Sequence, residues 1–113
     1  METLIIIVVA VLFLVWRMKP TKGVRPISAH QLKQELNDSN KVYIDVRTPA
    51  EFKARNIKQF KNMPLGSDLS KLPKDKEIVV ICQSGMRSAQ ACKQLKKLGY
   101  EKVTNVRGGI GSY

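Results

Sequence analysis

Apolar residues form one long run near the start of the chain and several short runs farther on. The long run covers residues 4–16 and contains no polar side chain. From Pro26 onward the apolar runs recur roughly every ten to fifteen residues, and polar turns separate them. This pattern predicts an apolar N-terminal helix followed by a small folded domain.

The short runs predict strands that alternate with short helices. Residues 77–82 (EIVVIC) form a continuous apolar run, which is typical of a central parallel strand covered on both faces. Ser28 followed by Gln31, and Thr48 followed by Pro49 and Glu51, are capping patterns that begin helices. The predicted strands are residues 41–46, 77–82 and 102–106, and the predicted helices are residues 29–36, a brief helix after Thr48, and residues 88–98.

These elements predict an α/β fold. Alternating strands and helices form a mostly parallel central sheet flanked by helices, and we place this domain at residues 27–113. Residues 19–26 hold two prolines and a glycine and are interpreted as a linker. One transmembrane helix at residues 1–18 is predicted to precede the linker and the domain.

The prediction of a membrane anchor depends on the charges around residues 4–16. As a helix this run is about 20 Å long, against a hydrocarbon core of about 30 Å, so only a thin span is expected. Arg17 and Lys19 follow it and Glu2 precedes it. This asymmetry predicts a single-pass protein of the cell membrane, with the N-terminus outside and the domain facing the cytoplasm. The alternatives are a cleaved signal peptide and a helix packed on the domain.

The chain is strongly basic. It has 20 Lys and Arg residues against 9 Asp and Glu, a net charge of +11. Without the four basic residues up to Arg25 and without Glu2, 16 basic and 8 acidic residues leave +8 on the domain. Such a positive charge attracts the domain to anionic lipid headgroups and attracts small anionic substrates to the domain. We expect a membrane contact through residues 4–16, and no nucleic-acid partner, because no nucleic-acid motif is present.

The candidate for chemistry is Cys82, at the carboxyl end of a predicted central strand. Active sites of open α/β sheets lie at this edge. A loop that curls into a helix N-terminus points backbone N–H groups inward, which stabilises a thiolate and lowers its pKa. Gly85 allows the positive φ that such a turn needs, and Arg87 offers a guanidinium for an oxyanion. The complete loop after Cys82 is Gln83, Ser84, Gly85, Met86, Arg87 and Ser88.

Other interpretations of the two cysteines stay open. Cys82 as an ordinary buried thiol is the alternative to a nucleophile. Cys92 lies on the apolar stripe of the predicted helix 88–98 and is interpreted as core filling, with a resolving thiol as its alternative. His30 is the only histidine, and we expect no metal and no cofactor.

Four ordered segments make residues 27–113 resemble the rhodanese-like family, a sulfurtransferase module. They are IDVRTPAEF at residues 44–52, NMPL at 62–65, CQSGMRS at 82–88 and GGIGSY at 108–113. The resemblance implies a rhodanese-type sulfurtransferase that moves a sulfane sulfur from a donor such as thiosulfate, through a persulfide on Cys82, to a thiol or protein acceptor. It also implies that Arg87 holds the loop and the small anionic donor.

Two further residues are expected to support this site. Asp45 and Arg47 end the predicted strand 41–46 at the same edge of the sheet, where they support the loop or form a structural salt bridge. Related phosphatases have five residues between Cys and Arg, whereas this chain has four, Gln83 to Met86. The shorter loop suits one sulfur atom rather than a phosphate.

The sequence departs from the family pattern in two places. Arg55, Asn56 and Ile57 stand where a Gly-His-Ile segment is common, so the turn there is expected to be built differently. The sequence ends at Tyr113 without a terminal helix, so one side of the pocket is expected to be more open, or covered by a membrane or a partner. The alternative functions are a non-catalytic membrane-tethered binding module and a redox relay between Cys82 and Cys92.

Overall fold

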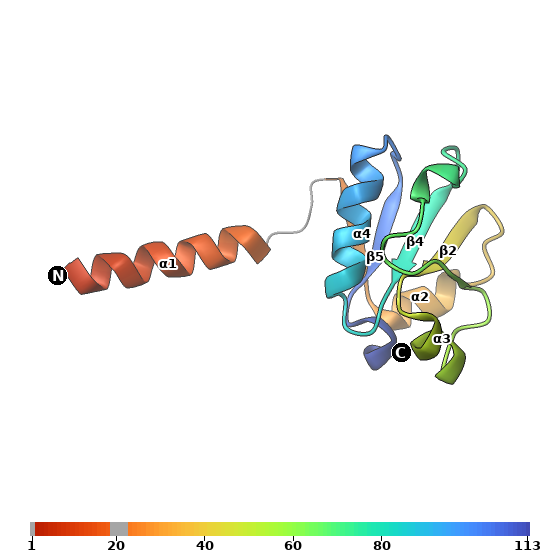
Figure 1. Ribbon diagram of the computed structural model, residues 1–113, viewed down its shortest axis with the longest axis horizontal. Coiled ribbons are helices and arrows are strands. Elements are labelled where there is room, and N and C mark those ends of the chain that lie inside the picture. Colours follow the sequence, from red (N-terminus) through yellow and green to blue (C-terminus); the bar gives the residue numbers. More distant parts are fainter. Residues whose placement is uncertain (1, 19–22) are drawn as a thin grey trace.

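The domain is built on a single parallel sheet. The computed structural model describes residues 2–18 and 23–113, without the side chains of residues 15–18. Five strands pair in the order β1-β5-β4-β2-β3, and all pairs are parallel (Figure 1). The strands are β1 (Val24–Ile27), β2 (Lys41–Asp45), β3 (Lys61–Asn62), β4 (Glu77–Ile81) and β5 (Val103–Val106), and the helices are α1 (Glu2–Met18), α2 (Ala29–Glu35), α3 (Pro49–Ala54), α4 (Met86–Lys97) and the 3₁₀ turns η1 (Leu69–Lys71) and η2 (Gly109–Ser112).

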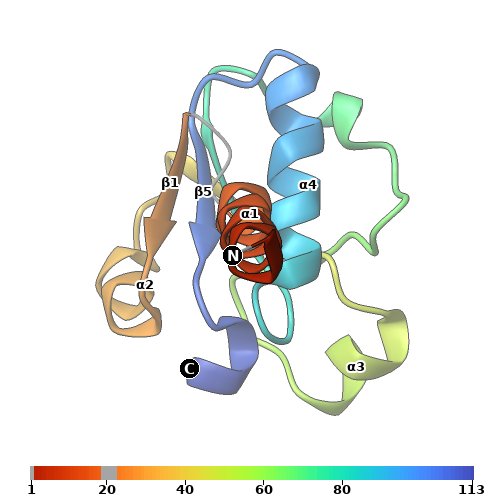
Figure 2. The same cartoon turned by 90° about the vertical axis from the view of Figure 1, so that its left-hand side faces the viewer.

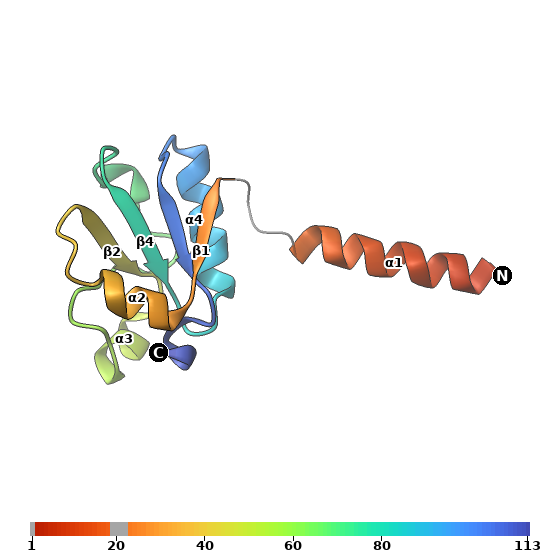
Figure 3. The same ribbon diagram turned by 180° about the vertical axis from the view of Figure 1, so that it is seen from behind.

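Helices cover both faces of this sheet, so the predicted α/β fold with a parallel sheet is confirmed. The central strand β4 is fully buried from Ile78 to Ile81, as its continuous apolar run predicts. Successive side chains alternate between the faces. Ile78 and Val80 pack with Leu95 of α4, whereas Val79 and Ile81 pack with apolar side chains of α2 and η2. Figure 3 shows α2 across the face opposite α4.

The two helix starts predicted from capping patterns are confirmed in detail. The Ser28 hydroxyl accepts a hydrogen bond from the Gln31 N–H at the start of α2. At α3, Thr48 and Glu51 form a reciprocal capping box, with Pro49 at the first helical position. These local bonds satisfy backbone donors that have no partner within a helix. The capping signals alone therefore place both helices correctly.

The structure differs from the predicted organisation at the start of the domain. The predicted linker overlaps β1, because Val24, Arg25 and Pro26 pair with β5. Proline lacks an N–H, so it is tolerated on an edge strand, and its presence hid this strand in the sequence. The rest of the predicted linker, residues 19–22, lies outside the described residues. The two-residue strand β3 was also not predicted, since so short a segment has no alternating pattern.

The N-terminal helix does not support the predicted anchor. α1 has 17 residues, about 25 Å at about 1.5 Å per residue, which is less than the hydrocarbon core of about 30 Å. Among the described residues no helix is long and apolar enough to cross a membrane. The predicted transmembrane helix at residues 1–18, and the membrane contact through residues 4–16, are therefore not supported. Its side chains from Glu2 to Leu14 are exposed, so the alternative of a helix packed on the domain is not seen either. The predicted orientation toward the cytoplasm stays a prediction.

Candidate active site

Cys82 follows the last residue of β4, at the carboxyl edge of the sheet. Because side chains alternate along a strand, Cys82 lies on the same face as Val80, under α4. Its side chain is fully buried. Gln83 and Ser84 are exposed, and the chain then turns into α4 (Figure 2). The position of the candidate nucleophile agrees with the prediction from the sequence.

Hydrogen-bond donors surround the sulfur of Cys82. The Gly85 N–H donates to Cys82 Sγ over 3.0 Å. The Cys82 thiol donates to Ser88 Oγ over 3.3 Å, and the Ser88 hydroxyl donates to the Gly85 carbonyl oxygen over 3.1 Å. When the thiol loses its proton, the Ser88 hydroxyl can turn its hydrogen to the sulfur, because an ionised sulfur accepts and no longer donates. The site therefore accommodates both the thiol and the thiolate.

These donors act against the effect of burial on the thiol. Burial raises the pKa of Cys82, because a thiolate loses its hydration. The Ser88 hydroxyl and the backbone N–H groups of Ser88, Gly85 and Ser84 lower that pKa by hydrogen bonding to the charged form. The donors prevail, so the pKa of Cys82 lies below its ordinary value. A larger share of Cys82 is thus a nucleophilic thiolate at neutral pH.

Gly85 allows the turn that brings these N–H groups to the sulfur. Its φ is +104°, in the left-handed region that favours glycine, as predicted. It caps α4, which therefore begins at Met86 rather than near Ser88. Consequently Met86, Arg87 and Ser88 occupy the first turn of the helix. The helix N-terminus then lies nearer Cys82 than the sequence indicated.

Arg87 binds the carboxylate of Glu51, a contact that was not predicted from the sequence. Its Nη1 donates to Glu51 Oε1 over 2.7 Å, and its Nη2 donates to Glu51 Oε2 over 2.9 Å. The guanidinium of Arg87 lowers the pKa of Glu51 to about 2, with further help from Thr48. Glu51 was recognised only as part of the capping box of α3. No signal in the sequence relates residues 51 and 87, because only the fold brings α3 to the active-site loop.

Asp45 and Arg47 form a buried ion pair beside this contact. Arg47 Nη2 lies 2.8 Å from Asp45 Oδ2, and the two side chains are 2% and 0% exposed. Arg47 also donates to the carbonyl oxygens of Glu51 and Arg55 in and after α3. The pair therefore holds α3 against the end of β2, and α3 in turn carries the partner of Arg87. This supporting arrangement is compatible with the role expected for Asp45 and Arg47.

The turn η2 packs directly on the backbone of the active-site loop. The Ile110 N–H donates to the Cys82 carbonyl oxygen over 2.9 Å, and the Gly111 N–H donates to that of Gln83 over 3.0 Å. A side chain at Gly109 would lie 2.7 Å from the Gln83 carbonyl carbon and closer still to the Cys82 oxygen. This support was not predicted from the sequence, although the glycine pair at residues 108–109 is a signal for close backbone approach.

The second cysteine belongs to the core. Cys92 is buried in the cluster between the sheet and α4, so its interpretation as core filling is confirmed. Burial raises the pKa of Cys92 to about 12. Such a thiol stays protonated at neutral pH, so the structure gives no support to Cys92 as a resolving thiol. Among the described residues, no group of three or more His, Cys, Asp or Glu side chains is placed to hold a metal ion.

Phe60 follows the segment where the sequence departs from the family pattern. Its side chain is buried and packs edge-on against Tyr43 of β2, with ring centroids 5.3 Å apart. Ile57 is buried in the same cluster. The altered turn is therefore anchored by apolar packing under the sheet, on the face that α2 covers.

Comparison with known proteins gives consistent matches. A sulfurtransferase of Allochromatium vinosum is 41% identical over 91 residues, which cover 77% of this chain and 85% of that protein. A candidate sulfurtransferase of Bacillus subtilis is 38% identical over 91 residues, with coverages of 77% and 87%. The crystal structure of a rhodanese-like domain protein from Staphylococcus aureus superposes with a TM-score of 0.70 at 29% identity, covering 78% of this chain and 89% of that one.

These relatives support a sulfurtransferase role, and the family assignment covers most of the chain. Residues 28–113 match the family model of the rhodanese-like domain. The matched segment contains β2 to β5, the loop that begins at Cys82, and η2. The chain therefore belongs to the rhodanese-like family.

Proposed function

We propose that this protein is a sulfurtransferase that carries a sulfane sulfur as a persulfide on Cys82, from a thiosulfate-type donor to a thiol acceptor. The names of its relatives support sulfur transfer in general. The surroundings of Cys82 support the more specific role of this residue. One observation carries the proposal: a buried sulfur receives the Gly85 N–H at 3.0 Å and lies 3.3 Å from the Ser88 hydroxyl.

The proposed reaction has two steps that balance without a redox partner. The Cys82 thiolate attacks the outer sulfur of thiosulfate, the S–S bond of the donor breaks, and sulfite leaves with the electron pair. The product is the Cys82 persulfide, whose terminal sulfur is negatively charged. In the second step an acceptor thiolate attacks this terminal sulfur, and Cys82 leaves as a thiolate. Each step breaks one sulfur–sulfur bond and forms another, and the second step leaves the transferred sulfur on the acceptor.

The loop suits the charge that this cycle moves. The negative charge lies on Cys82 Sγ before the first step and on the terminal sulfur after it. Backbone N–H groups at Ser84, Gly85 and Ser88 already lower the pKa of the thiol, which means that they stabilise negative charge there. Because the start of α4 holds these groups, they already point at the sulfur before the first step.

Arg87 has a double part in this proposal. Its guanidinium fixes the loop to α3 through Glu51, and its positive charge attracts an anionic donor. About a third of each side chain is exposed, 35% for Arg87 and 33% for Glu51. An incoming sulfonate can therefore approach the outer edge of the guanidinium while the pair stays intact.

A non-catalytic binding module is the second candidate, and one observation favours it. Cys82 is fully buried, so a donor reaches the sulfur only if the loop or a neighbouring side chain moves. In that case the exposed loop residues, such as Gln83 and Met86, would present a surface to a partner protein. This candidate predicts that Cys82 takes up no sulfur.

Intact mass spectrometry of the full chain separates the two candidates. The protein and its Cys82→Ser variant are incubated briefly with thiosulfate, weighed, and then treated with cyanide. A sulfurtransferase gains one sulfur that requires Cys82, and cyanide removes it as thiocyanate. No gain in a folded sample, with thiosulfate or with a low-molecular-weight persulfide, contradicts the proposal and favours the binding module.

A further inference from the structure

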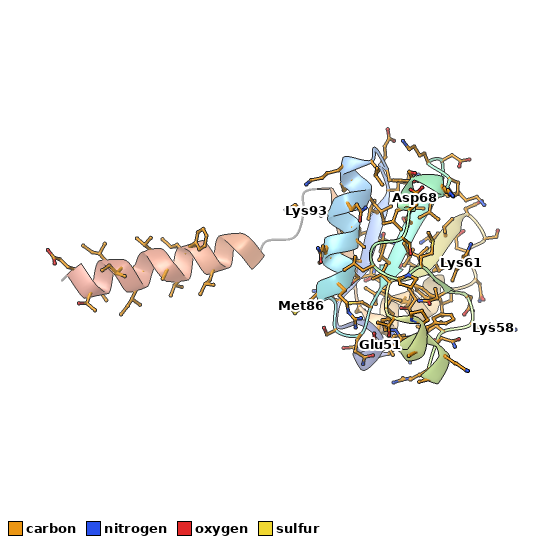
Figure 4. The ribbon with its side chains drawn as sticks, viewed as in Figure 1. Glu51, Lys58, Lys61, Asp68, Met86 and Lys93 are labelled. Atoms are coloured by element: carbon orange, nitrogen blue, oxygen red, sulfur yellow. The ribbon has the colours of Figure 1, made fainter. Side chains whose placement is uncertain are left out.

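One exposed side of α4 begins at the active-site loop and runs along the whole helix. At about 100° per residue, the positions of Met86, Gln90, Lys93 and Lys97 lie within about 60° of one another around the helix axis. All four are exposed, whereas Ser88, Ala91, Cys92 and Leu95 form the buried side of the helix. Figure 4 shows Met86 and Lys93 on the same outer side of the domain. We call these four residues the α4 stripe.

The end of the stripe nearest Cys82 is apolar. The Met86 side chain is 81% exposed, and in the described part of the domain Leu65 is the other large apolar side chain that is exposed. Met86 directly follows Gly85, whose N–H contacts the sulfur of Cys82. Methionine is flexible and is enriched where proteins meet, because it adapts to irregular partner surfaces. An exposed methionine next to Gly85 therefore suits contact with a partner.

The rest of the stripe carries positive charge on Lys93 and Lys97. The sequence has no Asp or Glu between Glu77 and Glu101. Among the described residues Lys93 and Lys97 form no ion pair, whereas Lys41 binds Glu35 and Glu77 on the far side of the sheet. Lysines without an ion pair repel one another and attract an acidic surface.

The length of the stripe indicates the size of the partner. From Met86 to Lys97 the helix rises about 16 Å at about 1.5 Å per residue. A small molecule bound at Cys82 does not reach Lys97. A protein surface or a peptide covers this distance easily, and its charge would be opposite to that of the lysines.

We propose that the α4 stripe docks an acidic acceptor protein and brings its thiol to Cys82. This inference rests on the proposed function, because the acceptor receives its sulfur from the Cys82 persulfide. The acceptor thiolate attacks the terminal sulfur, a new S–S bond forms on the acceptor, and Cys82 leaves with the electron pair. Met86 provides an apolar contact beside the reacting atoms, and Lys93 and Lys97 attract the acidic surface.

The test compares two synthetic cysteine peptides as acceptors. Both have the same length and one cysteine, flanked by glutamates in one peptide and by glutamines in the other. The full chain is first charged with sulfur, which intact mass confirms, and transfer to each peptide is then followed by mass at low and high salt. We expect the glutamate peptide to react about tenfold faster at low salt, and this advantage to disappear at high salt.

Matched charge reversals locate the effect on the domain. The double variant Lys93→Glu with Lys97→Glu is expected to lose the advantage of the glutamate peptide. The control is Lys58→Glu with Lys61→Glu, which makes the same change of charge at exposed residues on the opposite side of the domain (Figure 4). The control is expected to retain most of the advantage. Equal effects of the two double variants would overturn the docking proposal, since only net charge would then matter.

The outcomes separate this inference from the proposed function. If Cys82 gains no sulfur, the proposed function fails, and the docking inference fails with it before any peptide is added. If Cys82 gains sulfur and the two peptides react equally, only the docking inference fails.

A membrane is the other anionic surface to test. If the peptides react equally and vesicles of anionic phospholipid bind the full chain through Lys93 and Lys97, the stripe is assigned to lipid and the inference is overturned.

Discussion

Arg87 and Glu51 hold the active-site loop to α3 through two parallel hydrogen bonds, 2.7 and 2.9 Å long. The contact joins residues from separate parts of the chain, and a buried ion pair holds the helix that carries Glu51. Arg47, paired with Asp45, binds the Glu51 carbonyl oxygen. The loop that carries Cys82 is therefore supported from the side of α3 as well as from its own helix.

The Glu51–Arg87 pair predicts a loss of stability in acid. The pKa of folded Glu51 is lowered to about 2, below its ordinary value of about 4.3. The contribution of Glu51 to stability is thus fully present above the ordinary pKa, and it disappears as the pH falls toward 2. Urea unfolding of the protein and of Glu51→Gln measures this difference. We expect a constant difference above about pH 5 that shrinks between about pH 4.3 and 2; a difference independent of pH would contradict this assignment.

Ser88 is expected to control the reactivity of Cys82. Its hydroxyl is the first of the groups that lower the pKa of Cys82, so Ser88→Ala should raise that pKa. A hydrogen bond to a charged group is worth about 1.5–3 kcal/mol, so alkylation by iodoacetamide at neutral pH should slow by about tenfold. The dependence of this rate on pH gives the pKa directly.

Two variants control for the loss of a side chain in this loop. Ser84→Ala keeps the backbone N–H through which Ser84 acts, and it should leave the pKa of Cys82 nearly unchanged. Ser88→Thr keeps the hydroxyl and should restore much of the reactivity. The assignment is wrong if Ser88→Ala and Ser84→Ala alkylate at the same rate across the pH range.

Gly109 is expected to tolerate no side chain. In Gly109→Ala the new Cβ would lie 2.7 Å from the Gln83 carbonyl carbon, at a φ of +58°. The backbone of the loop must then move, and we expect a loss of at least about 2 kcal/mol in the free energy of unfolding, together with slower alkylation of Cys82. Gly111→Ala is the control, because the Cβ added there would lie 3.2 Å from its nearest neighbour, the Gln83 carbonyl oxygen. Equal stability of the two variants in urea would refute the close packing of η2.

The buried pair of Asp45 and Arg47 predicts a large effect of removing one charge. The Arg47 side chain is 2% exposed, and Asp45→Asn removes the carboxylate that neutralises its charge. The expected loss is about 3–5 kcal/mol in urea unfolding. Arg25→Gln provides the comparison, because Arg25 is 43% exposed in its pairs with Glu35 and Glu77. Arg25→Gln should lower the free energy of unfolding by less than about 1 kcal/mol. Similar losses for both variants would count against a supporting role for the buried pair.

Local patterns were sufficient for much of the fold. The apolar run of β4, the cap at Ser28 and the capping box at Thr48 each depend on neighbouring residues, so they can be recognised along the chain. The conformation of Gly85 is also local, since a turn from strand to helix over so few residues needs a positive φ. The predicted anchor is not supported for a related reason: residues 4–16 are apolar, but among the described residues no helix is long and apolar enough to cross a membrane.

By itself the sequence determined the order of α2, β2, α3, β4, α4 and β5, the place of Cys82 at the end of β4, and the short loop that follows it. Only the tertiary structure decided that Arg87 pairs with Glu51, that β1 joins the edge of the sheet beside β5, and that η2 supports the loop. The physical reason is the range of the interactions. Caps and periodicity act over a few residues, whereas these contacts connect distant segments, and their partners are chosen only when the parallel sheet brings its carboxyl ends to one edge.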